Sequence, residues 1–336
     1  MKNYWKWLCL IETSRKKSNK IINILINYLK HNQIDKKQWD ACVDQAFNGN
    51  SYAASWYLDL VHEGWEALVE NDYERVMPLT AATKFGISYL FQPYFSQQLG
   101  VFSKSKLNPG IVEDFIQSIP AHFKFVEINL NSFNKINSKK NTFVLNNNYL
   151  LDLINPYERL VKKYTTNTRR NLKKSTTNKL SISKNIKPEA LIKLFRNNRG
   201  KQLKKWNDAH YHILQRIMYT SVYKGKGVLY GVYTEFNELC AAAFFLKNNN
   251  RLVFLFSGSN QSARENAAMT LLIDSVIQEF ASTRTVFDFE GSNNVNLARF
   301  YRGFGAKEIT YPALRLNNFS FPMKQIFQIY KRFKKE

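Results

Sequence analysis

Residues 228–316 constrain the fold of this chain more than any other segment. They begin with three strand patterns separated by polar turns, and this arrangement predicts an antiparallel meander. The middle pattern is almost wholly apolar, as is typical of a central strand covered on both faces. The three patterns occupy residues 228–233, 239–246 and 252–257.

Two helical patterns and two further strand patterns follow the meander. From Met269 to Phe280 the apolar positions step by three and one, and so define one helical face. A second stripe runs from Leu297 to Phe304 and stops at Gly305. The predicted order is therefore meander, helix, strand, helix, strand. The two strands after the meander are expected at 285–289 and 309–316.

The first half of the chain has a similar order but no repeated sequence. Helical patterns, one of them capped by a serine, alternate with short strand patterns, and an Asn-rich loop precedes the last strand. We expect helices at 21–29, 35–47, 51–64 and 111–119, strands at 65–69, 75–79, 87–91, 123–130 and 149–153, and the loop at 131–148.

The composition agrees with two domains. The 336 residues, 44% of them hydrophobic, can fill sizeable cores. The aromatic content of 15% excludes a disordered chain, and no apolar run approaches the ~18–20 residues of a membrane span. We predict an α/β (α+β) fold with two lobes, each a mostly antiparallel central sheet flanked by helices. The expected segments are an N-terminal appendage and helix at 1–34, a lobe at 35–155, a basic connector at 156–187 and a second lobe at 188–336.

The net charge is strongly positive, because 49 basic residues against 26 acidic ones give +23. Such a chain is attracted to polyanions: nucleic acid, an anionic membrane surface or a phosphate-rich cofactor. The charge gathers between Lys162 and Lys205, where 15 basic residues accompany one acid, Glu189. This segment is either a solvated helical face or a surface that binds polyanions. The candidate polyanion-binding residues are Arg169, Arg170, Lys173 and Lys174.

The second helical stripe carries the spacing of a known superfamily. At intervals of three, four and four residues it contains Asn294, Leu297, Tyr301 and Gly305. Together with the order of elements, this spacing resembles the GNAT superfamily of acyl-CoA-type N-acyltransferases. The resemblance implies that the hydroxyl of Tyr301 serves the leaving group. Core packing on the same aromatic stripe is the alternative for Tyr301.

Two such halves joined by a basic segment resemble the Fem-type (FemABX-like) tandem GNAT proteins, whose founding members add amino acids to peptidoglycan precursors. The block YTTNTRRNLKKS at 164–175 is similar to the Arg- and Lys-rich signature between the halves of that group. The strand end DFEGS at 288–292 is similar to its Asp-containing strand. The resemblance covers roughly residues 50–320 and implies two GNAT-like lobes, the C-terminal one carrying the acyl-donor site.

One departure from the superfamily concerns the donor. Its pyrophosphate loop normally has two small glycine-type positions at a helix N-terminus, where backbone N–H groups hold the phosphates. Here Ala267 and Met269 stand in their place, which weighs against close approach of coenzyme A. An aminoacyl-tRNA would need the loop less, so acyl-CoA and aminoacyl-tRNA are both candidate donor substrates, with no cofactor tightly bound. The residues implied in donor binding are Arg264, Asn266, Ala267, Ala268, Met269 and Asn294.

Two acidic residues end the strand pattern before the second helix. Asp288 and Glu290 are two positions apart, so on a strand they would point to the same face. There they could orient or deprotonate an amine, or raise each other's pKa. Alternatively, one of them caps the following helix. The candidate catalytic residues are Tyr301, Glu290 and Asp288, and the longer reach of Glu290 favours it.

An amide cluster lies in the segment FQPYFSQQLG. Amides suit sugar or peptide groups, so Gln92, Gln97 and Gln98 are candidate acceptor-binding residues, and a hydrogen-bonded loop explains them equally well. The five histidines and three cysteines have no metal-ligand spacing. We therefore predict no metal.

These observations lead us to expect an N-acyltransferase that moves an acyl or aminoacyl group to an amine, with a cell-envelope precursor as a candidate acceptor. Two alternatives stay open: a lipid N-acyltransferase at a membrane surface, and a non-catalytic nucleic-acid-binding protein on a GNAT scaffold. The candidate partners are tRNA and an anionic membrane surface. The scattered cysteines and the lack of a convincing signal peptide favour a cytoplasmic monomer or dimer, at most peripheral to the inner face of the membrane.

Overall fold

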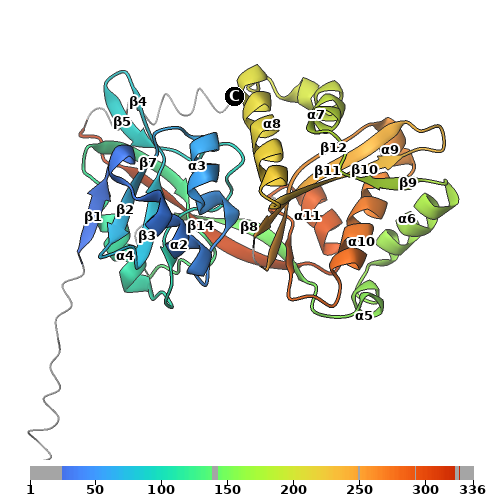
Figure 1. The fold of residues 1–336 in the computed structure, drawn as a ribbon, viewed down its shortest axis with the longest axis horizontal. Coiled ribbons are helices and arrows are strands. Elements are labelled where there is room, and N and C mark those ends of the chain that lie inside the picture. Colours follow the sequence, from blue (N-terminus) through green and yellow to red (C-terminus); the bar gives the residue numbers. More distant parts are fainter. Residues whose placement is uncertain (1–24, 138–142, 249, 292, 322–324, 326–336) are drawn as a thin grey trace, which may run out of the picture.

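The structure is a computed structural model that describes residues 25–137, 143–248, 250–291, 293–321 and 325. Its helices and strands form two halves that lie side by side, joined by a long twisted sheet (Figure 1). The expected α/β fold class is confirmed. None of the helices in this described part of the chain is long and apolar enough to cross a membrane.

The N-terminal half alternates helices with short strands. Two of its helices begin where a polar side chain bonds to backbone N–H groups: Asp35 accepts from two of them at α2, and Asn108, followed by Pro109, caps α4. The elements are β1 (Ile26–Leu29), η1 (His31–Gln33), α2 (Lys36–Gln45), η2 (Ser51–Ala53), α3 (Ser55–Val61), β2 (Glu66–Glu70), β3 (Arg75–Leu79), β4 (Ala81–Lys84), β5 (Ile87–Leu90), β6 (Phe102–Ser103), α4 (Pro109–Gln117), β7 (Phe123–Asn129) and β8 (Phe143–Asp152).

The C-terminal half follows the order expected from the sequence, and the basic connector before it also has regular structure. Asn207, Asn260 and Asn294 cap α8, α9 and α11 by the same mechanism. The elements are α5 (Tyr157–Val161), α6 (Thr166–Thr177), β9 (Ser181–Lys184), α7 (Pro188–Asn197), η3 (Arg199–Gln202), α8 (Asp208–Tyr223), β10 (Gly227–Tyr233), β11 (Leu239–Asn248), β12 (Arg251–Ser259), α9 (Gln261–Glu265), α10 (Ala268–Phe280), β13 (Val286–Asp288), α11 (Val295–Arg302) and β14 (Lys307–Asn317).

The sequence led us to expect a separate central sheet in each half, but the strands are not divided in that way. Ten of them share one sheet in the order β4-β5-β7-β14-β8-β13-β12-β11-β10-β9, and β1-β2-β3-β6 form a second one. The link is β14, which pairs with β8 over 307–314 and with β7 over 313–317. Because β14 is bonded on both sides, neither of its edges leaves a row of backbone groups unpaired. This pairing holds β14, which comes from the C-terminal half, between two strands of the N-terminal half.

Two predictions for the N-terminal half are wrong. Apolar spacing at 21–29 predicted a helix, but Ile26 to Leu29 form β1 and pair with β2; the earlier part of that segment, up to residue 24, lies outside the described residues. The loop expected at 131–148 includes the start of β8, where Phe143 pairs with Leu314 of β14. Both strands are held by partners that local pattern does not reveal.

One hydrophobic cluster extends across both halves. Trp39, Tyr57 and Trp65 of the N-terminal half are fully buried in the same cluster as Leu214 and Phe244 of the C-terminal half. Two other clusters fill the C-terminal half around Phe287 and the N-terminal half around Phe115. The shared core fixes the two halves relative to each other, which matters for any site built between them.

Candidate functional site

The candidate site begins where two neighbouring strands part. The parallel pairing of β12 with β13 ends at Val253 and Asp288, although β12 continues to Ser259. Beyond β13 the chain turns sharply, because Glu290 and Gly291 have φ values of +59° and +63°. A Cβ on Gly291 would lie 2.2 Å from the carbonyl oxygen of Asn147, so only glycine permits this close approach to β8. The turn fixes the position of Glu290.

Glu290 is partly buried between the two halves. Its Oε1 accepts a hydrogen bond from the hydroxyl of Tyr52, which belongs to η2 of the N-terminal half and is 3% exposed. Burial raises the pKa of the Glu290 carboxyl well above its usual range; the Tyr52 hydrogen bond opposes this shift, and the charge of Asp288 adds to it. A carboxyl group with a raised pKa is suited to proton transfer.

Asp288 has a different environment from the one expected. It is almost fully buried, its Oδ2 lies 2.9 Å from Nη1 of Arg251, and its Oδ1 accepts from the backbone N–H of Glu290 at 2.9 Å. Because Glu290 lies beyond the end of β13, the two carboxyl groups do not share the face of a strand, as the sequence suggested. Asp288 holds the turn that presents Glu290.

Tyr301 of α11 lies in the same neighbourhood as Glu290. Its ring packs against Phe289 at 4.8 Å and Tyr149 at 5.9 Å between centroids, and it is 7% exposed. Burial, together with the nearby charge of Glu290, raises the pKa of the Tyr301 phenol above its ordinary value. The phenol therefore keeps its proton at neutral pH. The structure thus brings two of the three candidate catalytic side chains together.

Two more tyrosines complete this cluster, and sequence reasoning did not find them as site residues. Tyr52 is one, and Tyr311 of β14 is the other. Burial raises the pKa of Tyr311 to about 12; a hydrogen bond from Gln97 opposes the shift, and the charges of Glu290 and Asp288 add to it. The only sequence signal for either residue was its aromatic character, which core packing also explains.

The three glutamines of the amide cluster have separate roles. Gln92 donates to the carbonyl of Ser96 at 2.5 Å and accepts from the N–H of Asn129 at 2.8 Å. Gln98 is buried and bridges Gln97 and the N–H of Ser132. Gln92 and Gln98 therefore hold the loop FQPYFSQQLG in place. Gln97, which is half-buried and bonded to Tyr311, is the one that the structure brings to the carboxyl cluster.

Five of the six residues implied in donor binding lie just before or at the start of α10; the sixth, Asn294, lies at the start of α11. Ala267 has a φ of +56°, the left-handed conformation that favours glycine, and α10 begins without a side-chain cap. Its first N–H groups are therefore not satisfied by a capping side chain, and such groups attract anions. Ala268 is fully buried and Met269 packs against the core of the C-terminal half.

A cavity of about 380 Å³ lies beside this helix start and is lined by Asn266, Ser262 and the end of α6. Asn266 accepts a hydrogen bond from Asn178 at 2.6 Å, so the basic connector contacts the donor loop directly. Arg264 is bound to Gln261 on the surface, and Asn294 caps α11. Of these residues, Asn266 is the one whose side chain lines the cavity.

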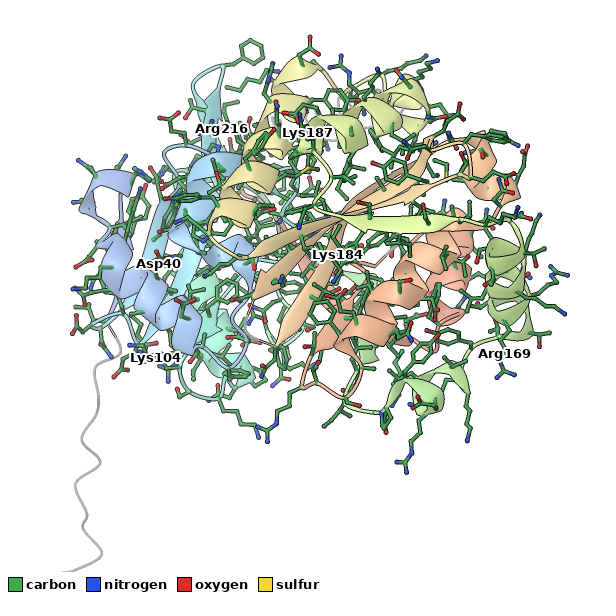
Figure 2. All side chains as sticks on the ribbon, turned by 45° about the vertical axis from the view of Figure 1, so that its right-hand side comes forward. Asp40, Lys104, Arg169, Lys184, Lys187 and Arg216 are labelled. Atoms are coloured by element: carbon green, nitrogen blue, oxygen red, sulfur yellow. The ribbon has the colours of Figure 1, made fainter. Side chains whose placement is uncertain are left out.

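The basic connector lies along α10. Thr168 and Ser175 of α6 are buried, whereas the four candidate polyanion-binding residues are exposed and form no ion pair with any described acidic residue. Figure 2 shows Arg169 at the outer edge of the molecule, directed away from the sheet. A buried carboxylate, Asp274 of α10, anchors the connector by accepting from the hydroxyls of Tyr157 and Tyr164.

Metal chemistry finds no support in the described residues. No group of three or more His, Cys, Asp or Glu side chains among them is placed to hold a metal ion. Cys42 and Cys240 are free and buried.

The chain has a Fem-like fold, as the sequence predicted. The crystal structure of FemX is similar to this chain with a TM-score of 0.61 and 11% identity, over 89% of this chain and 99% of that one. A conserved protein of unknown function from Bacteroides thetaiotaomicron VPI-5482 has a TM-score of 0.56 and 8% identity, over 87% and 99%. L-PGS from Bacillus licheniformis has a TM-score of 0.50 and 11% identity, over 87% and 95%. No protein-family description and no curated protein matches the chain.

Proposed function

We propose that this protein transfers an acyl or aminoacyl group from an activated donor to an amine, at the cluster formed by Glu290 and Tyr301. The observation that carries the proposal is that the Glu290 carboxyl, which is bonded to Tyr52 and has a raised pKa, lies near the Tyr301 phenol, which keeps its proton. Amide formation from an activated ester needs both: a base for the amine and an acid for the leaving group.

The steps follow from these two groups. The acceptor enters as an ammonium ion, and Glu290 takes one proton from it. The neutral amine attacks the carbonyl carbon of the donor and forms a tetrahedral intermediate. Tyr301 then gives its proton to the departing thiolate or ribose oxygen as the bond to the carbonyl carbon breaks. The second proton lost by the nitrogen returns to the Tyr301 phenolate.

The donor that we favour is an aminoacyl-tRNA, with acyl-CoA as the alternative. Ala267 and Met269, where the superfamily has glycine or a small residue, narrow the approach to the start of α10. A pyrophosphate must come close to these backbone N–H groups, whereas the ester of an aminoacyl-tRNA need not. The exposed cations of α6 lie on the connector that touches the donor loop through Asn178. The resemblance to the Fem-type proteins, whose founding members add amino acids to peptidoglycan precursors, also supports aminoacyl transfer.

The acceptor is proposed to be a small amine or a cell-envelope precursor that bears one. Gln97 is the amide closest to the carboxyl cluster through its bond to Tyr311, and it could hold a peptide or sugar group of that acceptor. Native mass spectrometry of freshly purified protein is the first experiment, because a co-purified donor or acceptor would identify the substrate directly.

With the donor identified, two variants test the site. Glu290→Gln and Tyr301→Phe should each lower turnover ~10²–10⁴-fold, the usual contribution of a general acid or base. Tyr230→Phe is the matched control, because it removes a phenol–carboxyl hydrogen bond to Glu279 in another part of the half. Full turnover in either site variant would refute the catalytic assignment.

The polyanion surface is tested by binding across a salt series. Replacing the four cations of α6 with Ala should weaken tRNA binding and flatten its salt dependence, since each neutralised phosphate adds to the slope. A matched variant carries Ala at four exposed lysines of the N-terminal half: Lys104, Lys106, Lys124 and Lys135. Lys104 lies at the far side of the molecule from Arg169 in Figure 2.

Anionic vesicles run in parallel separate the alternatives. Binding to vesicles but not to tRNA would replace the proposal with a lipid N-acyltransferase at a membrane surface. Binding to tRNA without any transfer, in a protein whose Glu290→Gln variant behaves as wild type, would favour a nucleic-acid-binding protein on this scaffold.

A further inference from the structure

The hydrogen bond that Glu290 receives comes from the other half of the molecule. Tyr52 and Glu290 are 238 positions apart in the sequence, and their side chains meet where the halves join. Tyr52 lies in η2, whose position is fixed by Asn50: its side chain accepts from the N–H of Ala53 and donates to the carbonyl of Gln98 at 2.9 Å. The hydroxyl of Ser51 reaches the carbonyl of Lys247 across the same junction.

The geometry leaves one carboxyl oxygen of Glu290 for a substrate. Among the described residues, the hydrogen bonds of this carboxyl involve Oε1 only, which Tyr52 occupies. The backbone on either side is held by the bond to Asp288 and by the contact of Gly291 with β8. Oε2 is therefore the oxygen left for an incoming ammonium group.

The other groups facing Glu290 do not replace Tyr52. Asp288 of β13 carries a negative charge that disfavours a second one beside it. The phenols of Tyr301 and Tyr311, from α11 and β14, are not among the described hydrogen-bond partners of the carboxyl, and its charge raises the pKa of both. Tyr57 of α3 donates to the carbonyl of Phe95 instead. Tyr52 is thus the donor that directly stabilises the charged form.

We propose that Tyr52 is a positioning residue of the transfer reaction: by donating to Oε1 it stabilises the carboxylate of Glu290 and directs Oε2 toward the acceptor amine. The N-terminal half therefore completes the reaction centre of the C-terminal half. This inference rests on the proposed function, in which Glu290 is the base. It adds that the base works only while the two halves are docked.

The titration of Glu290 tests the inference without any substrate. Glutamate labelled with ¹³C at the side-chain carboxyl reports each titration by NMR, and the Glu290 signal is assigned by its loss in Glu290→Gln. Because a hydrogen bond to a charged group is the interaction removed, Tyr52→Phe should raise the titration midpoint of Glu290 by about one to two pH units. Tyr230→Phe deletes the Tyr230–Glu279 bond and should leave the Glu290 midpoint unchanged.

A second variant covers the case in which Tyr52→Phe does not fold. Placing 3,5-difluorotyrosine at position 52 keeps the ring and the bond but makes the phenol a stronger donor, so the Glu290 midpoint should fall. An unchanged midpoint in either Tyr52 variant, or an equal change in Tyr230→Phe, would overturn the inference. Full transfer activity of Glu290→Gln would instead overturn the proposed function, so the two failures are distinguishable.

Discussion

Replacing Gly291 with Ala isolates the cost of the close approach that positions Glu290. The new Cβ would lie 2.2 Å from the carbonyl oxygen of Asn147 and 2.5 Å from Cα of Asn148, far inside normal contact. Gly225 is the matched position, because its φ of +66° is close to the +63° of Gly291, yet nothing lies within 4 Å of a Cβ there. Both substitutions force alanine into the left-handed region, and only one adds a collision with backbone.

The expected losses of unfolding free energy differ accordingly. The left-handed conformation costs about 1 kcal/mol for alanine compared with glycine, which is the whole effect at Gly225. Overpacking adds about 1–3 kcal/mol at Gly291, so its total is about 2–4 kcal/mol. Urea unfolding followed by tryptophan fluorescence, with the buried Trp39 and Trp65 as probes, measures both values. Equal losses in the two variants would refute the idea that β8 confines this turn.

Three further predictions use the same unfolding assay. Ala267→Gly should raise the unfolding free energy by up to about 1 kcal/mol by relieving its φ of +56°, whereas Ala268→Gly, inside α10, should lower it by about 1 kcal/mol; equal effects would contradict this. The folded state raises the pKa of Glu290, so ionisation of its carboxyl opposes folding. The unfolding free energy of Glu290→Gln relative to wild type should therefore rise with pH above the ordinary Glu pKa of about 4.3. A difference between the two proteins that does not change with pH would argue against this. Arg251→Ala should cost about 3 kcal/mol by leaving the buried Asp288 carboxylate unpaired, and adding Asp288→Asn should recover part of that loss.

The fold was largely predictable because its elements have local signals. The meander, α10 and α11 each carry apolar spacing of the correct period, and polar caps mark several helix starts. Short segments with remote partners were not predictable. Ile26 to Leu29 fit a helical spacing as well as a strand, and only pairing with β2 decides between them. The start of β8 owes its strand conformation to β14, which lies more than 150 positions later in the sequence.

The site was predictable in part for the same reason. Glu290 and Tyr301 follow each other closely in a segment with a recognisable spacing, so sequence alone could select them. Tyr52 gave no such signal, because an aromatic residue beside a short helix is most often a core residue and its bond to Glu290 spans 238 positions. Asp288 was assigned a direct role because a strand pattern does not reveal where the strand ends; its ion pair with Arg251 depends on the pairing of β12 with β13.

The position of β14 has a consequence for synthesis on the ribosome. β7 and β8 are consecutive strands, yet they are not neighbours: the space between them is filled by a strand that emerges about 190 residues after β7 begins. Until residues 307–317 leave the ribosome, the facing edges of β7 and β8 expose unpaired backbone groups. The N-terminal half, although made first, is thus completed last. During that interval the nascent chain is most prone to incorrect strand pairing and most in need of chaperone protection.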